Sequence, residues 1–222
     1  MSRVKRNIDW GDLRKFSPVS KSFGFDRGNP VDRYYVELFL QKNADLIRGN
    51  CLELLDSRYI KKFGSDKVTS YDILDIDTAN KKATLIADLT SEKPLGERNY
   101  DCIICTQALY LMYDVKKALQ NLCDALKVDG WLLITVPFLV KYSPEPLDCW
   151  RFTEYGLRRI LEELALQKRI EFHVESYGNL ITCVASLQGL AVEDLKEPEF
   201  AYKDDSYPLV ICAKVKKLNS KS

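Results

Sequence analysis

The stretch that decides the fold is YDCIICTQALYLMYDVKKALQNLCDALKVDGWLLITVPF, residues 100–138. Near each end lies a continuous apolar run, 101–106 and 131–136, as in a strand that is buried on both faces. Between these runs, residues 114–126 carry apolar side chains at helical spacing. A strand, a helix and a second buried strand in this order predict a parallel sheet covered by helices, which is an α/β fold.

Similar patterns continue on both sides of this stretch. Apolar runs typical of strands occur at residues 51–55, 67–74, 83–89, 172–178 and 209–215. Helical patterns cover residues 31–47, which follow Pro30, and 153–166, which open with Thr153 as a helix N-cap. The alternation of strands and helices over 222 residues predicts one domain.

Composition narrows the possible partners. The 33 basic and 32 acidic residues leave a net charge of +1, which predicts no nucleic-acid partner. The longest apolar run, residues 131–140, is half the length of a spanning helix and contains a proline, so we expect no membrane insertion. Because the first residues carry charges without an apolar segment behind them, we expect no secretory signal and a cytoplasmic location.

The seven cysteines lie mostly inside apolar runs, as reduced thiols do. Cys102 and Cys105 have the CxxC spacing of a metal or redox site. Residues three apart on a strand point to opposite faces, however, and no second ligand pair accompanies them. We therefore expect both thiols to pack in the core and no metal to bind.

Polar residues follow the predicted strands at their carboxyl ends, where open α/β sheets bind ligands. The expected strand ends are at Glu53, Asp72, Asp88 with Leu89, Thr106 with Gln107, and Pro137 with Phe138. An acid about 20 residues beyond the first turn is placed to bind ribose hydroxyls, and Asp72 follows Glu53 by 19 residues.

In this order, the pieces resemble class I S-adenosylmethionine-dependent methyltransferases, most clearly in LKVDGWLLITVP at residues 126–137. A subgroup often found beside glycosyltransferases in polysaccharide or natural-product pathways is closer still. Its phrases are FGFDRGNPVDRYYVELFL at 23–40, IRGNCLELLDSRYIKKFG at 47–64, DCWRFTEYGLRRIL at 148–161 and SYGN at 176–179.

The resemblance implies a Rossmann-like fold with a seven-stranded, mostly parallel sheet, an antiparallel last strand and helices on both faces. It also implies S-adenosylmethionine as cofactor and S-adenosylhomocysteine as product. We expect residues 1–48 to form an arm and helix that cover the cofactor, residues 49–217 the methyltransferase core, and residues 218–222 a disordered tail.

The first turn, Glu53 to Ser57, departs from the family pattern, in which an acid is followed by two glycines at alternate positions. Leu55 replaces the first glycine. Because leucine does not readily adopt positive φ, we expect a differently shaped turn here. Two alternatives stay open: a catalytically silent binding or scaffold protein with this fold, and a nicotinamide-dependent oxidoreductase. The second alternative predicts a GxGxxG turn, which the sequence lacks.

The resemblance places the adenine beside Asp88 and Leu89, the ribose beside Asp72 and the sulfonium near Gln107. The N-terminal phrase offers donors and aromatic faces for the methionine part, although it also suits an ordinary helix start with an ion pair. The expected cofactor-binding residues are Arg27, Tyr35, Glu53, Asp72, Asp88, Leu89 and Gln107.

Methyl transfer needs alignment of the acceptor and, where required, a base. His173 is the base candidate by pKa, but it lies inside a predicted strand, and Asp148 and Tyr142 lie in the better placed loop after residue 137. The expected acceptor-binding residues are Tyr110, Tyr113, Trp150 and Arg151, although Trp150 also suits an anchor for the next helix. We expect a hydroxyl or amine of a small polar acceptor, such as a saccharide or nucleotide-linked sugar, and a monomer or homodimer.

Overall fold

The computed structural model describes residues 11–145 and 148–219. Seven strands form one sheet in the order β3-β2-β1-β4-β5-β7-β6. The pairs among β1 to β5 are parallel, and β7 runs antiparallel to both of its neighbours, which confirms the predicted sheet. The strands are β1 Gly49–Leu54, β2 Val68–Asp75, β3 Leu85–Ile86, β4 Tyr100–Thr106, β5 Leu126–Pro137, β6 Ile170–Tyr177 and β7 Val210–Lys217.

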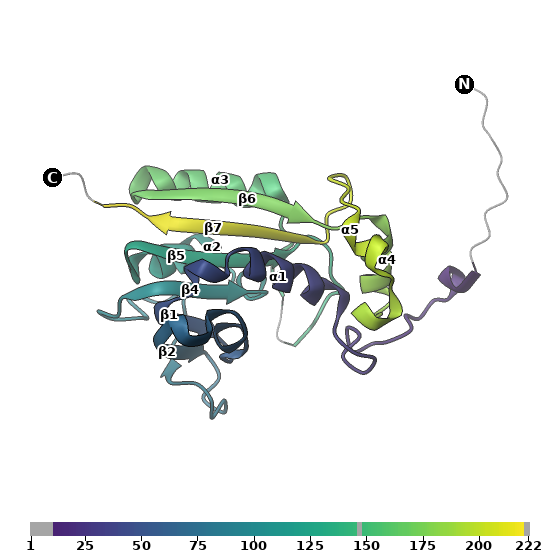
Figure 1. Cartoon of the computed structure of the whole chain (residues 1–222), viewed down its shortest axis with the longest axis horizontal. Helices are drawn as coiled ribbons and strands as arrows, with labels where there is room; N and C mark the ends of the chain where they lie inside the picture. The colour runs from purple at the N-terminus through teal and green to yellow at the C-terminus, as the bar shows by residue number, and fades with distance from the viewer. Residues whose placement is uncertain (1–10, 146–147, 220–222) are drawn as a thin grey trace, which may run out of the picture.

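Helices cover both faces of the sheet (Figure 1). One hydrophobic core lies under α2 and α3, and the other lies under α1 and α4. The helices are α1 Val31–Lys42, α2 Val115–Asp124, α3 Glu154–Gln167, α4 Leu180–Leu187 and α5 Glu197–Ala201. Short turns of other helix types are η1 Gly11–Arg14, η2 Ala44–Leu46, η3 Ile60–Gly64, η4 Ser65–Lys67, η5 Leu109–Leu111 and η6 Val192–Asp194.

Local sequence explains where the helices begin. Thr153 accepts a hydrogen bond from the Gly156 amide at the start of α3, as its predicted N-cap role requires. Asp114 accepts the Lys117 amide in the same way at the start of α2. Because α2 follows β4 and α3 follows β5, both helices begin near the edge of the sheet at which these strands end.

Cys102 and Cys105 lie in different cores, Cys102 under α1 and Cys105 under α2. Both are fully buried, and burial raises the pKa of the Cys105 thiol to about 12. The predicted packing role of the two thiols is therefore confirmed.

Two predicted strand ends were wrong. β2 continues past Asp72 to Asp75, because the apolar residues Ile73 and Leu74 extend its pairing with β1. β3 contains only Leu85–Ile86, so Asp88 and Leu89 lie in the loop that follows it.

The arm before α1 is fastened to the α4 side of the molecule. The Ser20 amide donates to the Gln188 carbonyl at 3.0 Å, and the Val192 amide donates to the Asn29 carbonyl at 2.7 Å. At the other end of the chain, the Leu218 amide donates to the Arg169 carbonyl at 2.7 Å, so hydrogen bonding continues one residue into the predicted tail. Residues 1–10 of the arm and 220–222 of the tail lie outside the described part.

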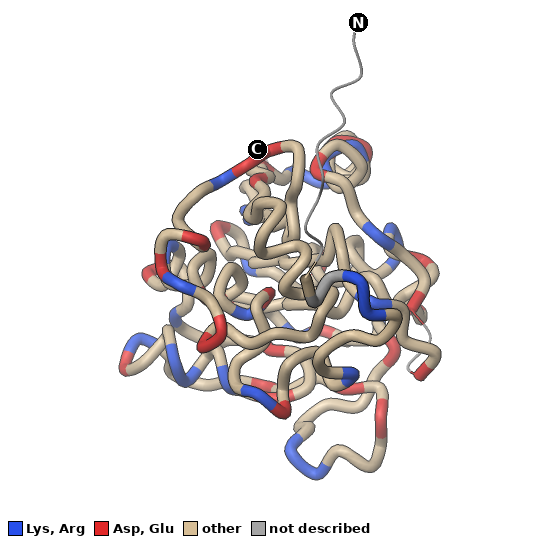
Figure 2. Tube along the Cα trace, turned by 90° about the vertical axis from the view of Figure 1, so that its right-hand side faces the viewer, with Lys and Arg blue, Asp and Glu red and all other residues tan. Residues whose placement is uncertain are grey.

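Along the described trace, basic and acidic residues are interspersed (Figure 2). No helix among the described residues is both long and apolar enough to cross a membrane.

Candidate functional site

The carboxyl ends of β1 and β4 carry two turns with unusual backbone geometry. Leu55 has φ 73° and Gln107 has φ 49°, both in the left-handed region. The expectation that Leu55 would avoid positive φ was wrong, because it adopts the conformation that suits the replaced glycine. Such a conformation costs a non-glycine residue about 1–2 kcal/mol.

Hydrogen bonds from β2 and its loop hold the Leu55 turn. The Leu55 amide donates to the Leu74 carbonyl at 2.8 Å, and Asn80 Nδ2 donates to the Leu55 carbonyl at 2.8 Å. Asn80 Nδ2 also donates to Asp75 Oδ2 at 2.6 Å. The Leu55 side chain is 54% exposed, so it lies at the surface of the turn and outside the core.

Glu53 is a buried acid at the end of β1. Its carboxylate is 2% exposed and accepts the amides of Tyr59 at 3.0 Å and Ile60 at 2.8 Å. Desolvation raises the pKa of Glu53 to about 7, although the two amides act to lower it. A positively charged ligand nearby would stabilise the ionised form of this carboxylate.

The acid at the end of β2 is Asp75, and Asp72 lies three residues before it. Asp72 is therefore about 10 Å from the strand end. Its carboxylate accepts hydrogen bonds from the hydroxyls of Tyr100 and Thr84, both at 2.8 Å. The expected ribose role of Asp72 does not suit this position. Asp75, which is 8% exposed and adjoins the Leu55 turn through Asn80, is better placed.

Asp88 and Leu89 have separate surroundings in the loop after β3. Asp88 is exposed, and its Oδ1 accepts the amide and hydroxyl of Thr90, both at 2.8 Å. Leu89 is 3% exposed, and its carbonyl accepts Asn121 Nδ2 at 2.8 Å. In this loop an exposed acid, Asp88, is therefore followed by a leucine, Leu89, that is buried in the core.

Buried polar atoms without a partner gather near the carboxyl edge of the sheet. Among the described residues they are Arg33 Nε, Gln107 Nε2 and Thr135 Oγ1. Gln107 follows β4 directly, and Thr135 lies beside Thr106 in the β4–β5 ladder. Such atoms lose hydrogen bonds to water without a replacement, which is costly unless a ligand supplies one.

Arg33 reaches this edge from the first turn of α1. Desolvation opposes its charge, yet Asp32, Tyr59 and Tyr110 nearby raise the pKa of the guanidinium. Asp32 Oδ2 is 3.9 Å from Arg33 Nε, beyond hydrogen-bonding distance. Because Tyr59 follows β1 and Tyr110 follows β4, the guanidinium lies between the two turns.

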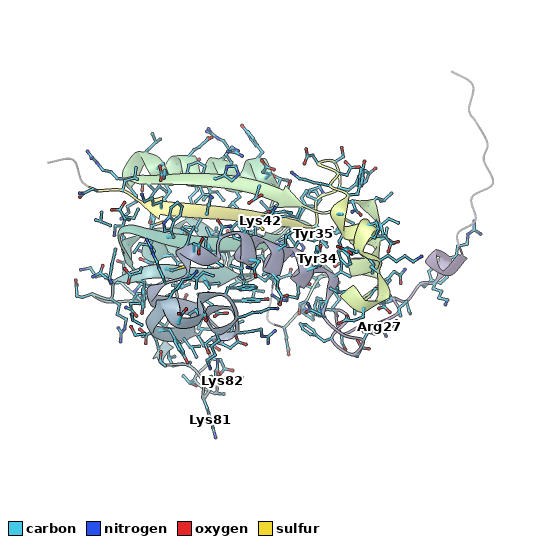
Figure 3. All side chains as sticks on the ribbon, viewed as in Figure 1. Arg27, Tyr34, Tyr35, Lys42, Lys81 and Lys82 are labelled. Atoms are coloured by element: carbon cyan, nitrogen blue, oxygen red, sulfur yellow. The ribbon has the colours of Figure 1, made fainter. Side chains whose placement is uncertain are left out.

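Arg27 and Tyr35 do not face this edge. Arg27 donates from Nε and Nη2 to the Asp194 carboxylate at 2.9 and 2.5 Å, which fastens the arm to η6. Tyr35 is 1% exposed, packs against Phe200 and Tyr177, and leaves no surface for a ligand. Figure 3 shows Arg27 on the arm and Tyr35 on α1, apart from each other. These contacts do not support the expectation that both residues close over the cofactor, which stays a prediction.

The loop after β5 is braced by an ion pair. Arg151 Nη2 is 2.9 Å from Asp148 Oδ2, and the Ser143 amide donates to the same oxygen at 3.0 Å. Although desolvation acts to raise it, these two hydrogen bonds hold the pKa of Asp148 below its usual value. A carboxylate held in this way is a weak base, so its structure does not support the expected catalytic role.

The other expected residues near this loop are more open. Tyr142 is 60% exposed, Tyr113 81% and Trp150 42%. Tyr110 is half-buried, with the Arg151 guanidinium 5.8 Å from its ring centre. These four residues come from the segments after β4 and β5, as predicted.

His173 lies elsewhere. It is exposed on β6, the edge strand beyond β7, and pairs with Lys214 four residues before the strand ends. The structure therefore separates it from the turns after β1 and β4, and the expected base role is not supported.

A family model described as a methyltransferase domain matches residues 48–171. The chain belongs to the methyltransferase-domain family. No curated protein matches it. The matched residues run from β1 to the start of β6 and include both turns.

Solved methyltransferases share the fold at low sequence identity. A S-adenosylmethionine-dependent methyltransferase from Archaeoglobus fulgidus is 12% identical over 83% of this chain and 94% of its own, with a TM-score of 0.55. The plantazolicin methyltransferase BpumL, solved with S-adenosylhomocysteine, is 11% identical over 90% of this chain and 89% of its own, with a TM-score of 0.57. The DhpI complex with the same product is 13% identical over 86% and 87%, with a TM-score of 0.52.

As a methyltransferase of this family, the chain uses S-adenosylmethionine and releases S-adenosylhomocysteine. The residues at the carboxyl edge fit such a cofactor. Arg33 Nε and Gln107 Nε2 offer hydrogen bonds that nothing in the described protein accepts, and Glu53 and Asp75 are buried acids near the carboxyl ends of β1 and β2. The cofactor carries a carboxylate, a sulfonium and two ribose hydroxyls, which are the complementary groups.

Sequence reasoning missed the role of two residues. Asp75 was overlooked because the expected strand end was Asp72, although Asp75 directly follows the apolar run at 67–74. Arg33 was not singled out because the sequence at residues 23–40 contains several polar residues. Only the packing of α1 shows that its side chain, and not that of Arg27, reaches the sheet edge.

Proposed function

We propose that this methyltransferase moves a methyl group from S-adenosylmethionine to a hydroxyl or amine of a small polar acceptor. The observation that carries the proposal is the group of buried, unpartnered polar atoms on Arg33, Gln107 and Thr135 at one edge of the sheet. A protein that only used this fold as a scaffold would gain from replacing them with apolar atoms.

We assign parts of the cofactor to residues of this chain. Arg33 suits the methionine carboxylate, because a guanidinium pairs with carboxylates. Glu53 suits the positively charged methionine end, and Asp75 takes over the ribose role first expected of Asp72. Gln107 stays near the sulfonium, and Asp88 and Leu89 stay beside the adenine.

When bound, the sulfonium supplies an activated methyl group, so the chain has to align the acceptor in line with it. Tyr110, Tyr113 and Trp150 line the acceptor side, and Arg151 braces their loop through Asp148. Tyr142 is the remaining candidate for a base. The acceptor class that we propose is a saccharide, a nucleotide-linked sugar or another intermediate of a polysaccharide or natural-product pathway.

The plantazolicin methyltransferase shares its fold with this chain, and this likeness in fold is what supports a natural-product intermediate as acceptor. A cytoplasmic location, a small-molecule acceptor without nucleic acid, and a monomer or homodimer stay predictions. The expectation that residues 1–48 cover the cofactor also stays a prediction, and we now limit this cover to the first turn of α1.

Isothermal titration of the full chain with S-adenosylmethionine and S-adenosylhomocysteine tests the cofactor site. We expect both to bind and to raise the melting temperature. No heat and no stabilisation at millimolar ligand would overturn the proposal.

Transfer is tested separately, with methyl-labelled S-adenosylmethionine and a panel of saccharides, nucleotide sugars and amines. Label should move to at least one hydroxyl or amine compound. Cofactor binding without transfer to any member of the panel would favour the silent binding protein instead.

A further inference from the structure

A cavity of about 380 Å³ lies beside the proposed cofactor edge, where the N-terminal ends of α2 and α3 meet. Its lining includes Tyr113, Asp114, Lys116, Trp150, Thr153 and Ile160. None of these residues is among those assigned to the cofactor. The cavity therefore lies outside the proposed cofactor contacts, and Tyr113 and Trp150 place it on the proposed acceptor side.

An aromatic wall forms one side of this cavity. The rings of Tyr113 and Trp150 have centres 6.0 Å apart and planes tilted by 33°. Trp150 Nε1 donates to the Tyr113 carbonyl at 3.1 Å, which fixes the indole in place while 42% of the residue stays exposed. A fixed and exposed indole offers a flat apolar surface at little entropic cost.

The charges around the cavity are nearly all paired. Lys116 Nζ is 2.5 Å from Glu163 Oε2, and Arg151 is paired with Asp148. Asp114 Oδ1 accepts the Lys117 amide at 2.9 Å, and no ion pair of Asp114 is found within the described ranges. The cavity thus has no spare cation to attract an anion, and it has a carboxylate able to accept hydrogen bonds from hydroxyls.

The segment that carries Trp150 is hydrogen-bonded to the segment that leaves β4. The amides of Cys149 and Trp150 donate to the Tyr110 carbonyl at 2.8 and 3.1 Å. Tyr110 lies three residues after Gln107, in the segment that leaves β4. A ring bound on Trp150 would therefore lie next to the acceptor side of the cofactor edge.

We propose that this cavity binds a neutral pyranose ring of the acceptor, with one face on Trp150 and hydroxyls on Asp114. A pyranose has a face of C–H groups and an edge of hydroxyls, which matches an aromatic wall beside an unpaired carboxylate. This inference rests on the proposed function, and it narrows the acceptor to neutral saccharides over anionic sugars.

Ligand-detected NMR and isothermal titration on the full chain test the site. The probes are methyl glucoside, methyl galactoside, methyl N-acetylglucosaminide and cellobiose, with glucose 1-phosphate as the anionic arm. We expect at least one neutral probe to bind at millimolar concentration and to bind more tightly than glucose 1-phosphate. No binding of any neutral probe at 50 mM, or tighter binding of the phosphate, would overturn the inference.

Variants locate the binding. Trp150→Ala should weaken saccharide binding about three- to tenfold, and Trp150→Phe should restore most of it, because an aromatic face remains. Asp114→Asn keeps a helix-capping side chain but loses the charge, and should weaken binding by a smaller factor. Tyr155→Ala is the matched control, because Tyr155 is 72% exposed on the same helix start and does not line the cavity.

Equal binding to Trp150→Ala and to the unchanged protein would overturn the inference. The titration with S-adenosylmethionine separates this result from a failure of the proposed function. If the unchanged protein does not bind the cofactor, the methyltransferase proposal is refuted. If the unchanged protein binds the cofactor but none of the neutral saccharides, only the pyranose site is refuted.

Discussion

Two turns leave the same edge of the sheet, one after β1 and one after β4. The Leu55 amide donates to the Leu74 carbonyl at 2.8 Å, and the Gln107 amide donates to the Thr135 carbonyl at 2.7 Å. Both residues have positive φ. Their side chains differ, because Leu55 is 54% exposed whereas the Gln107 amide nitrogen is buried without a partner.

The shared backbone shows that the sheet, and not the residue type, imposes the turn. Each amide extends the parallel ladder by one bond to the outer strand while the chain turns away, and both residues have positive φ at that point. A glycine would satisfy it without strain, and leucine satisfies it at a cost. The side chains then distinguish the two turns, since only Gln107 places a buried polar atom without a partner there.

The difference between the two turns matters for function only if a ligand binds at this edge of the sheet. Substitutions of Asp72 and Asp75, the two acids of β2, test this most strongly. Asp75→Ala should weaken S-adenosylmethionine binding by more than tenfold, because a hydrogen bond to a charged group is worth about 1.5–3 kcal/mol. Asp72→Ala should leave the affinity unchanged and lower the free energy of unfolding, since Tyr100 and Thr84 lose their acceptor. Titration calorimetry and urea denaturation measure both, and a larger loss of affinity in Asp72→Ala would return the ribose to Asp72.

The β1 turn follows a titrating acid, Glu53. The residue of β4 that pairs with Glu53 is the apolar Ile104, so the β4 turn has no acid at the matching position. With a pKa of about 7, Glu53 is mostly protonated at pH 6 and mostly ionised at pH 8. If the ionised form binds the positively charged cofactor, affinity should rise about tenfold over this range.

Glu53→Gln is the control for this pH dependence and should abolish it. Without ligand, the sign for stability is the reverse. The pKa of Glu53 is above its ordinary 4.5, so folding favours the protonated acid. The free energy of unfolding should therefore fall as pH rises from about 4.5 to about 7. A flat affinity profile in the unchanged protein would remove Glu53 from the site.

Gln107→Ala tests the β4 turn through two measurements of opposite sign. Loss of one hydrogen bond should weaken S-adenosylmethionine binding about three- to tenfold. Removal of a buried unpartnered amide should raise the free energy of unfolding of the unliganded protein, by about 1 kcal/mol. Gln120→Ala, which alters an exposed amide bonded to Gln167, is the matched control for both measurements. A gain in stability without any loss of affinity would show that the Gln107 amide serves no ligand.

The smallest effect is expected at Leu55. Leu55→Gly should raise the free energy of unfolding by up to about 1 kcal/mol, the difference between the relieved strain and the added entropy of the unfolded chain. Leu55→Ala keeps the Cβ atom and should bring no such gain. Urea denaturation compares the two variants, and equal stability would mean that the turn is not strained by its side chain.

Much of this arrangement was visible in the sequence, because strands and helices leave periodic patterns. The buried strands at 101–106 and 131–136 and the cap at Thr153 depend on local chemistry, and the structure confirms them. The end of β2 was placed at the wrong acid, because Asp72 and Asp75 both lie at the end of the apolar run and only the pairing of Ile73 and Leu74 with β1 shows that the strand continues to Asp75. The opposite surroundings of Arg27 and Arg33, six residues apart, depend on what each side chain meets across the fold.

The order of apolar and polar residues by itself determined the α/β architecture and the edge at which sheets of this kind bind ligands, because backbone hydrogen bonding and apolar burial act on local patterns. The family resemblance came from specific phrases such as LKVDGWLLITVP at residues 126–137. Only the tertiary structure decided which polar groups find a hydrogen-bond partner within the protein and which do not. Arg27 and Asp148 are satisfied, whereas Arg33 and Gln107 keep unpartnered nitrogens. The physical reason is that a hydrogen bond requires its partner within about 3 Å, and residues far apart in the chain reach that distance only after folding.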